Sequence, residues 1–102
     1  MIAVPVTISQ LLEDPELCER LMGAMFVVKL CTAVGTLKGY LLQVDTAQGR
    51  TLTLLVADHQ TGRRHILFVF TDSIVSMTYD DNDRLPDAEL RTHRQQSHFI
   101  TA

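Results

Sequence analysis

The chain lacks any run of apolar residues close to the roughly 20 that a membrane-spanning helix requires, so we expect no transmembrane segment. Residues 1–6 contain no basic group, which argues against a secretory signal. Only two cysteines occur among 102 residues, too few for a disulfide framework. We interpret Cys18 and Cys31 as small buried apolar side chains of a reduced intracellular protein, rather than as a disulfide or a metal pair.

Basic charge is also scarce. Nine Lys and Arg against twelve Asp and Glu give a net charge of -3, so the chain has little of the positive surface on which nucleic-acid binding depends. The four histidines, His59, His65, His93 and His98, show no ligand spacing with each other or with a cysteine. No glycine-rich phosphate loop or nucleophile elbow appears. We therefore expect no catalytic residues, no metal and no cofactor: the protein is predicted not to be an enzyme.

What the chain does contain is a series of five apolar segments typical of β-strands. Turn signals separate them at Gly35, at 48–49 and at 61–62. Gly39 lies inside the second segment, where a glycine is expected at a bend or a close backbone approach. The pattern predicts one mainly β domain, an antiparallel meander curved into a small barrel. Its predicted strands span residues 25–33, 36–46, 50–58, 63–71 and 74–79.

A helical segment precedes these strands. Thr7 and Gln10 have the spacing of a capping box, and Asp14 followed by Pro15 marks a second helix start. The helix from residue 14 to 22 carries one apolar stripe, and Gly23 can end it in the left-handed conformation. We expect this helix to cover an open end of the barrel rather than to bind a partner.

The period of two residues along each strand predicts which side chains form the core. We place inside the barrel Phe26, Val28, Leu30, Tyr40, Leu42, Val44, Leu52, Leu54, Val56, Ile66, Phe68 and Phe70. The last two strands are apolar on their other face as well, and an open edge of that kind is prone to aggregation. We therefore predict a partner-binding surface there, formed by Leu67, Val69, Val75 and Met77. The alternative is that residues 2–6 or 99–100 of the chain itself cover this face.

Three short motifs in this order resemble the Sm/Lsm family: Lys38-Gly39-Tyr40, then Val44-Asp45, then the run from Leu52 to Val56. A helix before the first strand, and a last strand that follows its predecessor almost without a loop, are similar to that family too. The resemblance implies an Sm-like small barrel, an N-terminal helix followed by a five-stranded, strongly bent antiparallel sheet, over residues 1–80. Residues 81–102 are expected to form a polar tail, helical over 86–96 or disordered.

RNA binding is the first function that an Sm-like fold suggests, and two loops argue against it. Ring-forming members carry an asparagine soon after the aspartate that corresponds to Asp45, and a basic residue and a glycine between the last two strands. This chain has no asparagine after Asp45, and Asp72 stands in the second loop. An RNA-binding Lsm ring protomer with degenerate loops, using Asp45 and Arg50, remains as the alternative function.

Among non-RNA-binding members, the chain most resembles the Sm-like Gemin subunits of the survival-of-motor-neuron complex, of the sixth Gemin type. The matching residues are Lys38-Gly39-Tyr40, Val44-Asp45-Thr46 and the run from Leu52 to Val56. This resemblance implies a scaffold subunit that pairs with another Sm-like protein, of the seventh Gemin type, through its fourth and fifth strands. It further implies contact with other subunits of that complex, a role in assembling spliceosomal ribonucleoproteins, only indirect contact with RNA, and a location in cytoplasm and nucleus.

Overall fold

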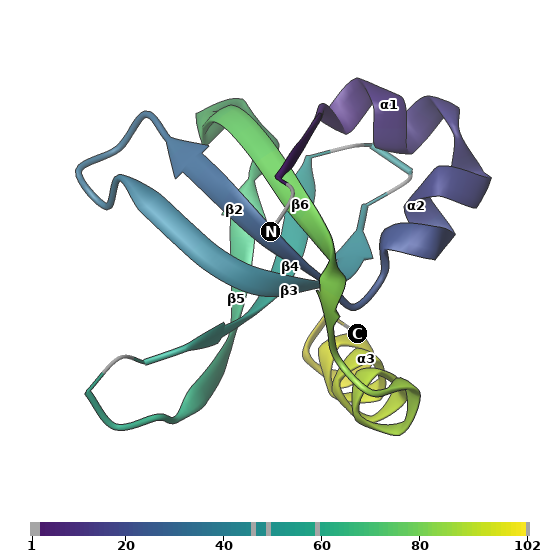
Figure 1. Ribbon diagram of the computed structural model, residues 1–102, viewed down its shortest axis with the longest axis vertical. Helices are drawn as coiled ribbons and strands as arrows, with labels where there is room; N and C mark the ends of the chain where they lie inside the picture. Colours follow the sequence, from purple (N-terminus) through teal and green to yellow (C-terminus); the bar gives the residue numbers. More distant parts are fainter. Residues whose placement is uncertain (1–2, 46, 49, 59, 102) are drawn as a thin grey trace.

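The fold is a single antiparallel sheet with three helices (Figure 1). The computed structural model describes residues 3–45, 47–48, 50–58 and 60–101, and side chains as far as Gln95. In these residues the sheet has six strands in the order β1-β6-β2-β3-β4-β5. The elements are β1 (Val4–Val6), α1 (Ile8–Glu13), α2 (Pro15–Leu21), β2 (Ala24–Leu30), β3 (Thr36–Val44), β4 (Thr51–Ala57), β5 (Arg64–Phe70), the 3-10 turn η1 (Thr71–Ser73), β6 (Ile74–Arg84) and α3 (Asp87–Thr101).

The predicted mainly β, antiparallel architecture is confirmed, and each of the five predicted strands is present as β2 to β6. The prediction of five strands is wrong, because β1 pairs with β6 and makes a sixth. The sheet ends at β1 on one side and at β5 on the other, so it is not closed. Figure 1 shows the β2–β3 and β4–β5 hairpins splaying apart from their common crossing point.

Local capping explains where the two N-terminal helices begin. The Thr7 hydroxyl accepts the N–H of Gln10 at 3.1 Å, and the Gln10 side chain accepts the N–H of Thr7 at 2.8 Å, which completes the predicted capping box. Asp14 then accepts the N–H of Leu17 at 3.1 Å, ahead of a helix that starts with proline. Gly23, with φ of 84°, follows the end of α2 in the left-handed conformation, as predicted.

The main core lies between one face of the sheet and helices α1 and α2, which lie together on one side of the molecule (Figure 1). Alternating residues of the strands supply one half of it and the helical stripe the other. The sheet contributes Val6, Ala24, Phe26, Val28, Leu41, Val44, Leu52, Leu54, Val69 and Met77, and the helical segment contributes Leu11, Cys18, Leu21 and the C-cap residue Met22. The predicted helix is therefore present, but it packs with α1 on one face of an open sheet rather than over the open end of a closed barrel.

A β-bulge in β3 sends apolar side chains to both faces of the sheet. The pairing with β4 shifts between Leu41 and Gln43, so Leu42 is an extra residue and points to the side opposite Leu41. Leu42 forms a second apolar cluster with Leu55 and Leu85, against which Leu90 of α3 packs. Both faces of this part of the sheet are thus covered, one by α1 and α2 and the other by the C-terminal helix.

The predicted inward face of β5 is reversed. Val69 is buried against the core, whereas Phe68 is 41% and Phe70 is 70% exposed. The reason is the register with β4, which places Val69 opposite the buried Leu52. An alternating pattern cannot indicate which face is inside when both faces are apolar.

The acidic segment predicted to leave the domain continues as strand. β6 extends to Arg84, and α3 begins after two intervening residues at Asp87, one residue after the predicted start of the helix 86–96, and continues beyond its predicted end. The Arg84 guanidinium donates to the carbonyl oxygens of Arg20 at 2.7 Å and Met22 at 2.8 Å, and also binds Asp81. These carbonyls lie at the end of α2, where the helix leaves acceptors unsatisfied, so Arg84 ties the helix to the last strand.

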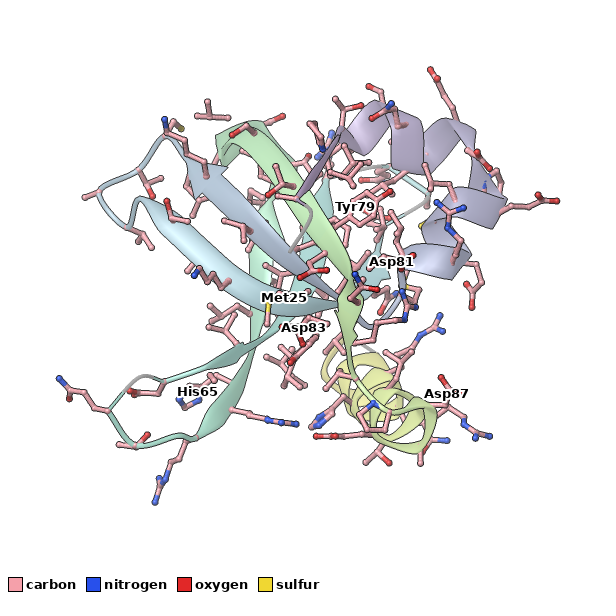
Figure 2. All side chains as sticks on the ribbon, in the orientation of Figure 1. Met25, His65, Tyr79, Asp81, Asp83 and Asp87 are labelled. Atoms are coloured by element: carbon pink, nitrogen blue, oxygen red, sulfur yellow. The ribbon has the colours of Figure 1, made fainter. Side chains whose placement is uncertain are left out.

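A hydrogen bond between Tyr40 and Asp83 joins β3 to the end of β6, with 2.8 Å between the two oxygens. Asp83 is labelled in Figure 2. Burial and this hydrogen bond raise the pKa of the Tyr40 phenol above its usual value near 10. The folded state therefore holds the phenol proton more tightly than the unfolded chain does. The resulting stabilisation is complete below about pH 10 and is lost as pH rises through the raised pKa.

We expect Tyr40→Phe to lower the free energy of unfolding by about 1 kcal/mol at neutral pH, because it removes one hydrogen bond. The variant should also lose less stability than the wild type between about pH 9 and 11, since it has no phenol at this position to titrate. Urea unfolding of the wild type and the variant at neutral pH measures the first effect, and repeating it at about pH 9 and about pH 11 measures the second. Parallel losses in both proteins would contradict the role given to Asp83.

Candidate functional site

Strand β5 forms an open edge of the sheet. It pairs with β4 along Arg64–Phe70 on one side, and on its other side no strand of the described chain lies against it. Natural proteins often protect an open edge by keeping its strand very short, whereas β5 has seven residues. Its unpaired side is therefore the longest accessible row of backbone hydrogen-bonding groups at either end of the sheet.

The hydrogen bonds at the two ends of the β4–β5 ladder show which residues face outward. The N–H of Thr71 donates to the Arg50 carbonyl at 2.9 Å, and the N–H of Asp58 donates to the Arg63 carbonyl at 2.7 Å. In an antiparallel pair, residues bonded to the partner strand alternate with residues whose N–H and C=O point away. The backbone groups that point out from the edge are those of Arg64, Ile66, Phe68 and Phe70.

Apolar side chains surround these backbone groups. Leu67, Phe68 and Phe70 are all exposed, Phe70 most of all. Phe68 and Phe70 lie on one face of β5 and Leu67 on the other, so both faces of the edge present apolar area. The side chains at the beginning of the strand, Arg64 and His65, are its only basic ones, and Arg64 is bound to Glu89 of α3. The remaining five residues carry neither a charge nor a proline, the usual protection of an edge strand.

A groove beside this edge widens the apolar area. It has a volume of about 870 Å³ and opens between the splayed hairpins, and Leu67 lines it. Its lining includes the apolar Leu37, Leu55 and Val56, together with the charged Lys38 and Asp58. The groove is contiguous with β5 and gives a strand that is added there room for side chains on that face.

The four residues of the predicted partner-binding surface do not lie together. Leu67 and Val75 are exposed, on β5 and β6 respectively. Val69 and Met77 are buried in the main core. The two strands are separated in the sheet by β2, β3 and β4, and only the turn η1 connects them. The open edge itself, with Phe68 and Phe70, was missed because both aromatics were assigned to the core.

The two residues of the alternative RNA site lie at the β3–β4 turn. Asp45 accepts the N–H groups of Ala47 at 3.2 Å and Gln48 at 3.3 Å, and so caps this turn with its own carboxylate. Arg50 is exposed, and its carbonyl accepts the N–H of Thr71 at the start of η1. The carboxylate of Asp45 is thus already bound within its own loop.

Titratable groups show no catalytic arrangement in the described residues. No cluster there of three His, Cys, Asp or Glu side chains could hold a metal ion. Both thiols are free; Cys18 is buried as predicted, but Cys31 is exposed, contrary to prediction, because it follows the end of β2. Burial, and the neighbouring Glu19 carboxylate, raise the pKa of the Cys18 thiol, which favours the unreactive form.

Comparison of the chain with protein-family models, curated proteins and solved structures yields no significant match. In the described part of the chain, no helix has the length and apolar character needed to cross a membrane. The open edge of β5 and the apolar side chains around it are therefore the features on which a function can be argued.

Proposed function

We propose that this chain is a non-catalytic, Sm-like scaffold subunit that pairs with another Sm-like protein through the β5 edge, in a complex that assembles ribonucleoproteins. One observation carries the pairing: a seven-residue strand with exposed apolar side chains on both faces and no strand of the described chain on its outer side, where the Phe70 carbonyl accepts a hydrogen bond from the Ser73 hydroxyl at 2.6 Å. Strand addition supplies affinity through main-chain hydrogen bonds and specificity through side-chain pockets. The identity of the partner class comes from the sequence resemblance.

The order of elements supports the Sm-like part of this proposal. Helix α2 precedes five consecutive antiparallel strands, β2 to β6. The last two of these are separated only by the three residues of η1. Both features agree with the order on which the resemblance to the Sm/Lsm family depends. In the Gemin type, the fourth and fifth strands form the contact, and β5 is the fourth strand after the helix.

Two features favour pairing over the alternative of an RNA-binding ring protomer. The carboxylate of Asp45 caps its own turn, so binding a base would require it to give up two backbone hydrogen bonds. The chain is also acidic overall, with a net charge of -3, and offers little electrostatic attraction to phosphates. A scaffold that contacts RNA only through its partners requires neither a free Asp45 carboxylate nor a basic surface.

A proline in β5 tests the pairing without breaking the sheet. The N–H of Phe68 points outward, so Phe68→Pro removes a group that the added strand would use and leaves the ladder with β4 intact. The matched control is Phe68→Thr, which also loses the aromatic ring but keeps the N–H. Each chain is used to capture proteins from a native lysate, and the captured proteins are quantified by mass spectrometry.

We expect an Sm-domain protein to be captured by the wild type and by Phe68→Thr, and to be reduced at least about tenfold with Phe68→Pro, the change that one lost hydrogen bond of about 1.4 kcal/mol produces. Equal melting temperatures for the two variants show that both are folded. If Phe68→Pro captures as much of that protein as the wild type does, β5 is not the interface.

A further inference from the structure

The two ends of the sheet differ in a way that bears on how many subunits can assemble. One end is β5, which has seven residues and no strand of the described chain on its outer side. The other end is β1, which has three residues and contains Pro5 at its centre. Short length and a proline are two of the devices by which natural sheets prevent strand addition at an edge.

β1 occupies the outer side of β6 along Met77–Tyr79, in the middle of a strand that runs from Ile74 to Arg84. Val4 pairs with Tyr79, Pro5 with Thr78 and Val6 with Met77. A strand from another molecule could reach this part of β6 only by displacing β1. It could not extend the sheet from β1 either, because proline has no N–H and fits an edge strand where that missing donor would face outward.

Contacts with the core hold β1 in place. Val6 is only 5% exposed and belongs to the main core, and Val4 is half-buried. The next residue, Thr7, is the N-cap of α1 and is fixed there by the capping box with Gln10. β1 is therefore held in place by the packing of its side chains and by the start of α1, which follows it directly in the chain.

We infer that β1 is a built-in edge cap that limits strand-edge assembly to a pair of subunits. A sheet with two open edges can associate head to tail, and such contacts produce rings or filaments. In the described chain, β5 is the one edge that is open along its whole length, since β1 covers the middle of β6 and leaves only the short stretches 74–76 and 80–84 on either side. Once β5 is paired, no full-length edge is left for a further subunit. The inference rests on the proposed pairing through β5, and it adds that β6, the other strand used in the Gemin type, is closed to a partner along Met77–Tyr79.

Release of β1 should therefore change the oligomeric state. The double substitution Val4→Pro and Val6→Pro leaves residues 4–6 all proline, so β1 can donate no hydrogen bond to β6. The control Val4→Thr and Val6→Thr weakens the apolar packing but keeps both N–H groups. Each full-length chain is examined by light scattering over a range of concentrations, with circular dichroism to confirm the fold.

We expect particles of at most two chains for the wild type and the threonine control, and particles larger than two chains for the proline variant. Adding Phe68→Pro to the proline variant should abolish the larger particles, because they need the β5 edge as their second contact. Rings or filaments of the wild type would overturn the inference, as would a folded proline variant that never exceeds two chains.

A covalent clamp provides a test that does not depend on destabilising β1. Pro5 and Thr78 lie directly opposite one another, and Pro5→Cys with Thr78→Cys, in a Cys31→Ser background, permits a disulfide across the two strands. We expect the oxidised chain to capture the same Sm-domain protein as the reduced chain, to within twofold. Loss of capture on oxidation, restored by reductant, would mean that the partner displaces β1, and would overturn the edge cap.

These results separate the inference from the proposed function. If Phe68→Pro leaves capture unchanged, the pairing through β5 is wrong, whatever the state of β1. If Phe68→Pro abolishes capture but the clamp does so as well, the pairing is right and the cap is wrong. The inference holds where the proline in β5 abolishes capture and the clamp does not.

Discussion

Replacing Phe26 with alanine should lower the free energy of unfolding by about 3 to 5 kcal/mol, the cost of removing a large aromatic side chain from a packed core. Phe26 on β2 is fully buried, and its ring centroid lies 5.9 Å from that of Tyr79 on β6. Domains of this size are stabilised by only about 5 to 15 kcal/mol in total. Urea unfolding followed by circular dichroism measures the change.

The matched control is Phe70→Ala, which removes the same ring from a site that is 70% exposed. We expect its effect to stay within about 0.5 kcal/mol, as for most surface substitutions. Comparable losses for the two variants would mean that Phe70 is buried after all, either in the core or in a stable contact between chains. Repeating the melts at several protein concentrations distinguishes those two cases.

This pair of phenylalanines shows how far the alternating pattern is informative. In β2, Phe26 and Val28 lie on one face, and the other face ends in the charged Lys29; the prediction that Phe26 and Val28 are buried is confirmed. In β5, all five residues from Ile66 to Phe70 are apolar, so either face could be the inner one. Only the register with β4 decides the matter, and register is a long-range property that no local pattern contains.

Elements determined by local chemistry were predicted well. The caps at Thr7 and Asp14 and the left-handed Gly23 follow from interactions within four residues along the chain. The five strand segments follow from β-branched and aromatic composition between turn signals. Their observed limits differ from the predicted ones by a few residues, except at the end of β6.

Elements determined by tertiary contacts were not predicted from the sequence. The bulge at Leu42 reverses the faces of β3 for reasons of sheet curvature. The segment 80–84 is acidic, yet it continues β6 because Tyr40 bonds Asp83 and Arg84 binds the end of α2. β1 is three residues long with a central proline, and only its pairing with a strand more than 70 positions away makes it regular structure.

The sequence predicts exposed apolar side chains on the last two strands, and the structure shows where such side chains lie. An apolar surface on the last two strands was expected, and exposed apolar residues do occur on both, at Leu67 and Val75. The sheet order separates these strands, so that β5 is an edge whereas β6 is internal along Met77–Tyr79. One sequence signal for the edge does exist: β5 has neither charge nor proline after His65, whereas β1 has Pro5.

Gly39→Val should lower the free energy of unfolding by about 3 kcal/mol or more, the upper range for overpacking of a fitted core. Gly39 lies inside β3, where the sequence predicts a bend or a close approach. A Cβ atom there would lie 2.9 Å from the Leu55 carbonyl oxygen, 3.0 Å from a methyl carbon of Val56 and 3.1 Å from the Leu54 Cβ. The nearest of these atoms belongs to the backbone of β4, so relief would require the two strands to separate.

Gly62→Ala provides the contrast for this prediction, because the two glycines are required for different reasons. Gly62 has φ of 70°, and nothing lies within 4 Å of the position of its missing Cβ. Substitution there costs only the left-handed conformation, about 1 to 2 kcal/mol, whereas Gly39→Ala already meets the β4 backbone. Thermal and urea melts should therefore rank the variants Gly62→Ala, Gly39→Ala and Gly39→Val in order of increasing loss. A Gly39→Val protein as stable as Gly62→Ala would mean that β3 does not approach β4 this closely, and that the curvature of the sheet arises elsewhere.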